Sequence, residues 1–245
     1  MLEHGINQAA GLQGMALQMS PKLVAFASHG NQQGELPLLW SLCTTWVDMG
    51  LPVVVLDGHA SESDQNPGLV HLMTDPMGHV PEDQDTVAWS VLPAAVGLAD
   101  LAGIGFNPDA LGDCFRKFAL VVLYANANVL SMLLKDRDLS PLLVVTPLKV
   151  SSLTAYQAMK QLLLEAGLHP TVANIAVGSS KTAGMTEPIQ NLQDCAMSFL
   201  GLTVKPITVS AANTGEASHH EITRLALQLL ENAVFLERHP IPRTH

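Results

Sequence analysis

The chain has 245 residues, 48% of them hydrophobic, and a formal net charge of −10, with 12 Lys and Arg against 22 Asp and Glu. This length can bury one sizeable core, and an acidic chain without a basic run is not expected to bind nucleic acid, because such binding depends on neutralising phosphates. Three widely spaced cysteines, Cys43, Cys114 and Cys195, favour thiols of a reducing cytoplasm over disulfides or a zinc site. No basic leader and no apolar run of membrane-spanning length is found, so we expect a soluble cytoplasmic protein, with peripheral attachment to the inner membrane left open.

Short runs rich in Val and Leu alternate with amphipathic stretches, which predicts an α/β fold with a doubly wound, mostly parallel sheet flanked by helices. We expect strands at 23–28, 52–57, 88–92, 119–124, 142–146, 171–177 and 203–206. We expect helices at 36–49, 93–101, 109–117, 127–135, 151–166, 187–200 and 216–236. The polar, Pro-containing segment 60–86 is expected to be a long surface excursion. We divide the chain into an N-terminal interaction segment, 1–20, and a single α/β domain, 21–245.

Residues 22–57 have the strand, Gly-containing turn, helix and strand of a phosphate-binding βαβ unit, with the turn where a Walker A motif would lie. The remnant of that loop comprises Ser28, His29, Gly30, Asn31, Gln32, Gln33, Gly34, Glu35 and Leu36. In the motif a Lys reaches the β- and γ-phosphates and a hydroxyl holds Mg²⁺, but here Glu35 and Leu36 stand at those positions. Two unit charges about 4 Å apart interact by roughly 4 kcal/mol at an effective dielectric of about 20. Replacing an attractive Lys with a repulsive Glu is therefore expected to weaken triphosphate binding severely.

Glu35 has two interpretations. It is either a structural acid in the first turn of a helix, where the helix dipole favours it and Pro37 fits close behind, or a residue with a specific ligand-binding role. In both cases it fills the place that a phosphate would occupy. Backbone N–H groups of the loop could still bind an anion, so weak ATP or ADP binding is left open, and no other cofactor is expected.

Three local patterns carry a resemblance to a known family. The loop is followed by a helix ending at Gly50 and a strand ending at Asp57, and segment 146–156 has Pro, Ser and an Ala-Tyr pair at the start of a Lys-containing helix. The N-terminal run is Asn7-Gln8-Ala9-Ala10-Gly11-Leu12-Gln13. The first two patterns resemble the MinD/ParA group of deviant-Walker ATPases, and the third is similar to the Asp-Gln-Ala-x-x-Leu-Arg motif of the flagellar-number regulators FlhG and FleN.

Four parts of the ATPase machinery depart from this resemblance. The signature Lys falls on Gly30, the second Lys on Glu35, the Asp two residues beyond Asp57 on His59, and the Walker B Asp on Leu123-Tyr124. Without charge compensation for the transferred phosphoryl group, hydrolysis by the usual route is not expected. We therefore interpret the chain as a pseudo-ATPase with no catalytic residue.

The resemblance also implies a partner-binding segment. In relatives it contacts and activates the GTPase FlhF, and here it would comprise Ile6, Asn7, Gln8, Ala9, Leu12 and Gln13. Asn7 and Gln13 replace the charged residues of the motif, so only its apolar contacts remain. The alternative is a single helical turn that docks on the chain's own domain.

Two further features have structural interpretations. His29, Asp57 and His59 are expected at the carboxyl ends of neighbouring strands, where they could hold a metal, but no HxH or HxxxH pair supports one and we expect none. The last helix has one apolar stripe, made of Ile222, Leu225, Ala226, Leu229, Leu230, Ala233 and Val234. Its polar face is poor in Lys and Arg, which favours packing against the sheet over contact with a membrane.

The sequence thus predicts a regulator of flagellar number, placement or biosynthesis that acts through protein contacts. Its partners would be a FlhF-like GTPase or flagellar components, and a homodimer is left open. The alternatives are an active, ATP-switched MinD-like ATPase, a MinD-like accessory protein of cellulose export or another envelope system, and, more remotely, a metal hydrolase.

Overall fold

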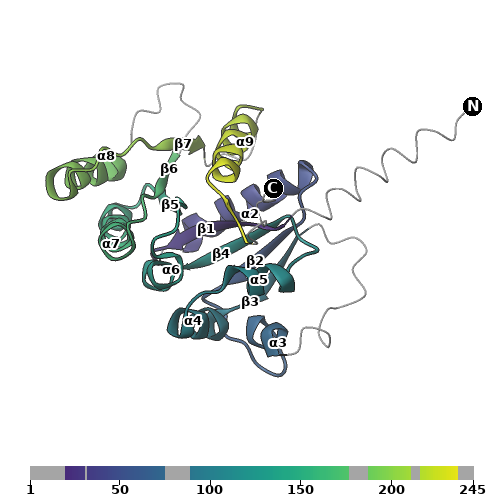
Figure 1. The fold of residues 1–245 in the computed structure, drawn as a ribbon. Coiled ribbons are helices and arrows are strands. Elements are labelled where there is room, and N and C mark those ends of the chain that lie inside the picture. The colour runs from purple at the N-terminus through teal and green to yellow at the C-terminus, as the bar shows by residue number, and fades with distance from the viewer. Residues whose placement is uncertain (1–19, 31, 75–88, 177–186, 211–215, 237–245) are drawn as a thin grey trace, which may run out of the picture.

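An eight-stranded sheet organises the described part of the chain (Figure 1). In the computed structural model this part comprises residues 20–30, 32–74, 89–176, 187–210 and 216–236. The strands are β1 (Lys22–Ser28), β2 (Val53–Asp57), β3 (Trp89–Pro93), β4 (Leu120–Asn126), β5 (Leu142–Val145), β6 (Thr171–Ala176), β7 (Ile207–Ser210) and β8 (Val234–Phe235). The helices are α2 (Gln32–Asp48), α3 (Leu69–Thr74), α4 (Ala95–Ile104), α5 (Pro108–Cys114), α6 (Ala127–Leu134), α7 (Lys149–Ala166), α8 (Glu187–Cys195) and α9 (Glu216–Glu231), with a π-helical turn, η1 (Ala196–Leu200), after α8.

The sheet is parallel along the path β3-β2-β4-β1-β5-β6-β7. This order confirms the predicted doubly wound, mostly parallel sheet. β1 pairs along its whole length with β4, whereas it meets β5 only at Phe26 and Ala27. The antiparallel strand β8 fills the remaining edge of β1 at Lys22 and Leu23.

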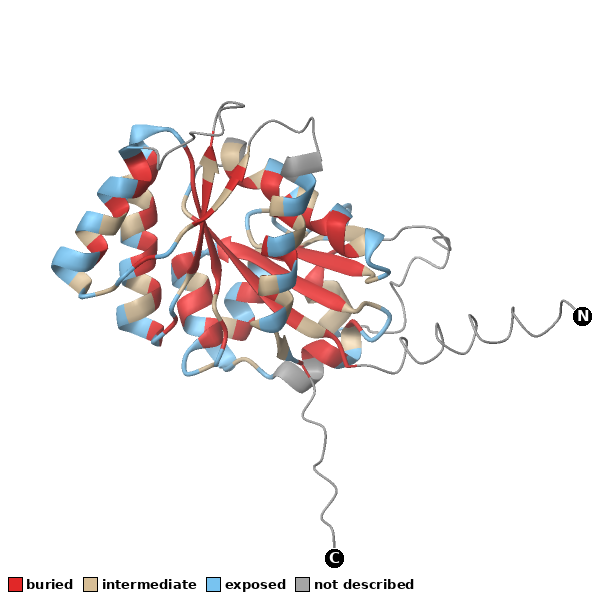
Figure 2. Cartoon of the chain, turned by 90° about the horizontal axis from the view of Figure 1, so that it is seen from above, coloured by how far each residue is buried: buried red, intermediate tan, exposed pale blue. Residues whose placement is uncertain are grey.

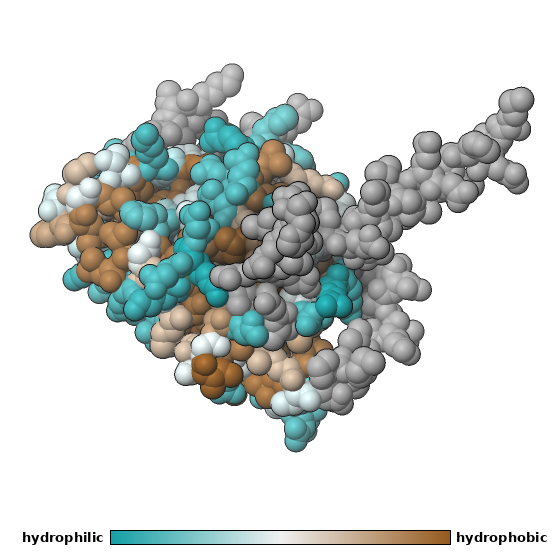
Figure 3. Space-filling view, in the orientation of Figure 1, coloured by the Kyte–Doolittle hydropathy of each residue, from teal (hydrophilic) through white to brown (hydrophobic). Residues whose placement is uncertain are grey.

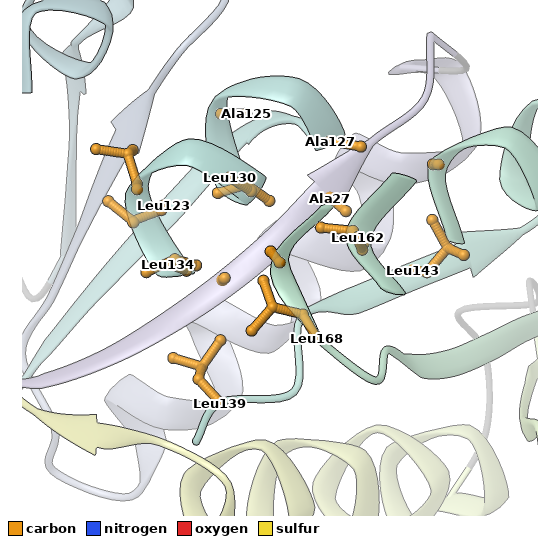
Figure 4. Close-up of a cluster of buried hydrophobic side chains, with 14 of the residues drawn as sticks. Ala27, Leu123, Ala125, Ala127, Leu130, Leu134, Leu139, Leu143, Leu162 and Leu168 are labelled. Atoms are coloured by element: carbon orange, nitrogen blue, oxygen red, sulfur yellow. The ribbon is translucent and has the colours of Figure 1, made fainter. Parts of the chain in front are cut away.

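Helices cover both faces of the sheet, so most strand residues are buried on both sides (Figure 2). On one face α2 and α9 enclose a core that includes Trp46 and Leu225. The other face is covered by α3 to α8, and Figure 4 shows Leu130 and Leu134 of α6 within this core. The two cores hold the carboxyl ends of β1, β2 and β4 in fixed positions beside the start of α2.

Several predicted boundaries are wrong. The strand predicted at 203–206 begins after Pro206, at Ile207, because Gly201 adopts a left-handed conformation that ends η1 and the chain then runs irregularly to Pro206. The helix predicted at 216–236 ends at Glu231, and the next residues form β8. On α7 the buried face centres on Ala155, Met159 and Leu162, whereas Leu153 is 58% exposed.

The predicted surface excursion at 60–86 is more structured than expected where it is described. It contains α3, whose Leu69 is fully buried, and the Glu62 carboxylate accepts the N–H groups of Val96 and Gly97 at 2.8 and 2.9 Å. This carboxylate caps the start of α4, where Ala94 offers no side-chain cap. No helix in the described ranges is long and apolar enough to cross a membrane.

Candidate functional site

The site predicted from the loop motif lies at the carboxyl end of β1, where the chain turns into α2. Gly30 has φ +94°, a left-handed conformation that glycine adopts without strain. α2 begins at Gln32, four residues before the predicted start, so Glu35 and Leu36 lie within its first turns. Asn31 and the side chains of Gln32 and Gln33 lie outside the described residues.

Glu35 is fully buried and its carboxylate is the centre of the site. It accepts hydrogen bonds from Ser28 Oγ at 2.7 Å, from the backbone N–H of His29 at 3.0 Å and from Tyr124 Oη at 2.9 Å. A buried carboxylate persists only where such donors replace water. These contacts favour the interpretation of Glu35 as a structural acid. Its hydrogen bonds run to the loop and to β4, in addition to its place in the first turn of α2.

His29 connects this carboxylate to the next strand and to α7. Its side chain is 2% exposed, with Nε2 2.5 Å from the carbonyl oxygen of Val144 and 3.4 Å from Glu35 Oε1. Because a carbonyl oxygen only accepts, Nε2 carries a hydrogen. Nδ1 lies 2.8 Å from Thr154 Oγ1. The loop is thereby tied to β5 and to the second turn of α7.

Tyr124 stands at the position of the expected Walker B acid and acts as a donor. Burial, together with the charge of Glu35, raises the pKa of its phenol above the usual value, so it stays protonated at neutral pH. Its ring meets Phe26 edge-on at 5.5 Å and lies 5.0 Å from the ring of His59. These contacts fill the space between the ends of β1 and β2 with side chains.

Asp57 and His59 do not join His29 in one cluster. β4 lies between β1 and β2, so the expectation that their ends are neighbours is wrong. His29 faces β5, whereas Asp57 accepts the N–H of His59 at 2.9 Å on the far side of Tyr124. Among the described residues, no group of three or more His, Cys, Asp or Glu could hold a metal ion.

Sequence reasoning placed Tyr124 at the Walker B position but missed its contact with Glu35, and it missed Val144 and Thr154 altogether. Tyr124, Val144 and Thr154 lie 89 to 125 positions from their partners, and no local pattern links them. The cap of α6 could have been predicted, because an Asn directly before an apolar helix is a typical N-cap. The Asn126 Oδ1 accepts the N–H of Val129 at 3.0 Å.

The other predicted sites have different outcomes. The proposed partner-binding residues of segment 1–20 lie outside the described residues. The last helix packs as expected, because Ile222, Leu225, Ala226 and Leu229 are buried. Trp46 of α2 donates to the Ala226 carbonyl at 3.2 Å, which joins the two helices of this face.

No family model and no curated protein matches the sequence. A chain of the MinC:MinD cell division protein complex from Aquifex aeolicus matches the structure with a TM-score of 0.58 at 14% identity, over 89% of this chain and 99% of that chain. A plasmid partition protein from Borrelia burgdorferi gives 0.52 at 14%, over 85% and 99%. The cell division ATPase MinD from Pyrococcus furiosus gives 0.51 at 14%, over 87% and 99%. The chain therefore has the fold of the MinD/ParA P-loop proteins.

Proposed function

We propose that this chain is a MinD-like regulator that acts through protein contacts and does not use a nucleotide switch. The observation that carries the proposal is the buried carboxylate of Glu35, which accepts the Ser28 hydroxyl and the His29 N–H of the loop together with the Tyr124 hydroxyl of β4. A nucleotide phosphate would have to displace this carboxylate, or share its donors and be repelled by its negative charge.

The catalytic side of the proposal rests on the neighbouring strand ends. A tyrosine hydroxyl stands where an acid would position Mg²⁺, and its pKa is raised, so it supplies no negative charge. Phosphoryl transfer in this fold depends on metal and lysine charge compensation. Leu36, Tyr124 and Glu35 supply neither a ligand set for the metal nor the positive charge of the lysine.

The biological role that we propose is control of flagellar number, placement or biosynthesis in the cytoplasm, with peripheral attachment to the inner membrane left open. It rests on the FlhG-like run Asn7–Gln13. The partners would be a FlhF-like GTPase or flagellar components. The matched MinC:MinD complex supports, at the level of the fold, a role in protein assemblies.

Calorimetry with ATP and Mg²⁺ tests the nucleotide part. We expect no binding at micromolar nucleotide and hydrolysis at background level, with the cell division ATPase MinD of Pyrococcus furiosus as the positive control for both measurements. Glu35→Ala is expected to leave hydrolysis at background, because Tyr124 and His59 remain. A low-micromolar dissociation constant for the unaltered chain would favour the ATP-switched alternative and overturn the proposal.

A further inference from the structure

Acidic and basic residues are unevenly divided along the chain. Residues 23–115 contain 12 Asp and Glu and no Lys or Arg, whereas the rest of the chain contains all 12 Lys and Arg and the other 10 acids. This range forms most of β1 and every described element at the β3 end of the sheet. Asp48, Asp64 and Asp100 are exposed there. The β3 end therefore carries a negative field, while the opposite end is close to neutral.

Two tryptophans form an accessible apolar surface at this acidic end. Trp40 of α2 and Trp89 of β3 have ring centroids 4.8 Å apart, and Trp40 is 36% exposed. Val91 is 42% exposed and lies two residues beyond Trp89, on the same face of the strand. Trp89 packs against the core beneath α2, so this face is the one that α2 only partly covers.

The strand that carries Trp89 and Val91 ends the sheet. β3 pairs with β2 on one side, and no strand of the described chain pairs with its other side. The outward N–H and C=O groups of such an edge can pair with an added strand. Larger apolar exposure gathers at the other end of the molecule, over α7 and α8 (Figure 3), and includes Phe199 of η1 at 75%. That second surface lacks the acidic surroundings, although the sheet also ends on that side, at β7.

We propose that Trp40, Trp89 and Val91 form a docking surface for a cationic, extended segment of another protein. Alternating apolar side chains of the segment would pack on the Trp pair and Val91, and its Lys or Arg side chains would lie over the indole faces and near Asp48. The acidic field selects this occupant. It repels nucleic acid and anionic membranes, and a second copy of the chain would bring acid against acid. The surface is separate from the phosphate loop, so the inference does not depend on the nucleotide question.

The probe is a fluorescein-labelled octapeptide of alternating lysine and valine, with the glutamate-valine peptide as its counterpart, and the readout is anisotropy with the full chain. We expect binding of the lysine peptide alone, weakened by high salt. Trp40→Ala and Val91→Lys should each weaken binding about tenfold or more, as expected for a central aromatic anchor and a repulsive edge charge. Phe199→Ala, which removes a more exposed aromatic from the neutral end, should bind like the unaltered chain.

Thermal unfolding of each variant shows whether it is folded, and Val91→Lys changes an exposed side chain that needs no repacking. The proposal is overturned by a lysine peptide that does not bind, by equal binding of the glutamate peptide, or by folded Trp40→Ala and Val91→Lys proteins that bind normally. If the unaltered chain is a dimer and Val91→Lys dissociates it, the surface is occupied by a second copy. If the unaltered chain binds phosphatidylglycerol vesicles and Val91→Lys changes that binding, the surface contacts a membrane. Either result also overturns the proposal.

Discussion

Glu35 accepts hydroxyl and N–H donors at the carboxyl ends of β1 and β4. Those donors come from Ser28, His29 and Tyr124, on two strands that share one register. Because three donors depend on this carboxylate, it contributes to the stability of the folded protein.

Replacing Glu35 with Ala should therefore destabilise the protein. Three donors would lose their acceptor, two of them in buried hydrogen bonds, and each donor left unsatisfied in this way typically costs about 1–3 kcal/mol. Urea denaturation should show the loss as a lower midpoint with an unchanged slope. Glu165→Ala is the matched control, because Glu165 is exposed on α7 and accepts only from Gln161. Equal midpoints for the two variants would contradict the role assigned to Glu35.

Tyr124 gives the site a pH dependence at alkaline pH. Burial and the Glu35 charge raise the pKa of Tyr124 above its usual value of 10.0. The folded state therefore holds the phenolic proton more tightly than the unfolded state. The resulting stability is fully present below pH 10 and is lost as the pH rises through the folded-state value.

Stability measured from pH 8 to pH 11 should fall more steeply for the unaltered chain than for Tyr124→Phe. The comparison isolates Tyr124, because every other side chain is the same in the two proteins. Parallel curves would show that the phenol has no special proton affinity in the folded state.

The elements show which parts of the fold sequence reasoning could reach. Long apolar runs such as the one that became β4 were placed within two residues, because both faces are buried and the pattern is continuous. β8 has only two residues, which is too short for any periodicity, and its pairing with β1 depends on β5 leaving that edge open. The predicted position of β7 was wrong for a related reason. The strand has only four residues, and the irregular stretch before it has a similar composition.

β8 should matter more than its length suggests. Leu236 follows it, is 1% exposed and donates its N–H to the Pro21 carbonyl at 2.9 Å. Leu236→Ala should lower the free energy of unfolding by about 3 kcal/mol, as for other buried leucines. Phe235→Ala is the adjacent control, because Phe235 is 47% exposed and contacts mainly Lys22, so its loss should be about 1 kcal/mol or less. Similar losses for both would mean that the end of the chain is not anchored through Leu236.

At the scale of the whole molecule, the alternation of strands and helices was enough to predict the doubly wound sheet, but not the site that the sheet assembles. The motif drew attention to Glu35, which the structure places at the carboxyl end of β1. It could not indicate that Tyr124, Val144 and Thr154 would converge on the same loop, because those contacts follow from strand order. The error over His29 and Asp57 has the same origin, since the insertion of β4 between their strands is a property of topology and not of local sequence.

The proposed biological role depends on a part of the chain that precedes this sheet. Residues 1–19 lie before β1, so their removal should leave thermal unfolding nearly unchanged, provided that the cut spares Ser20 and Pro21, which are both buried. If the FlhG-like run binds a partner, the shortened chain should lose capture of a FlhF-like GTPase and fail to restore flagellar number or position in a deletion strain. Gln8→Ala with Leu12→Ala should have the same effect in the full chain, since both positions match the motif. Shortened and full-length proteins that capture the same partners and complement equally would remove the most specific support for the proposed flagellar role, without bearing on the site around Glu35.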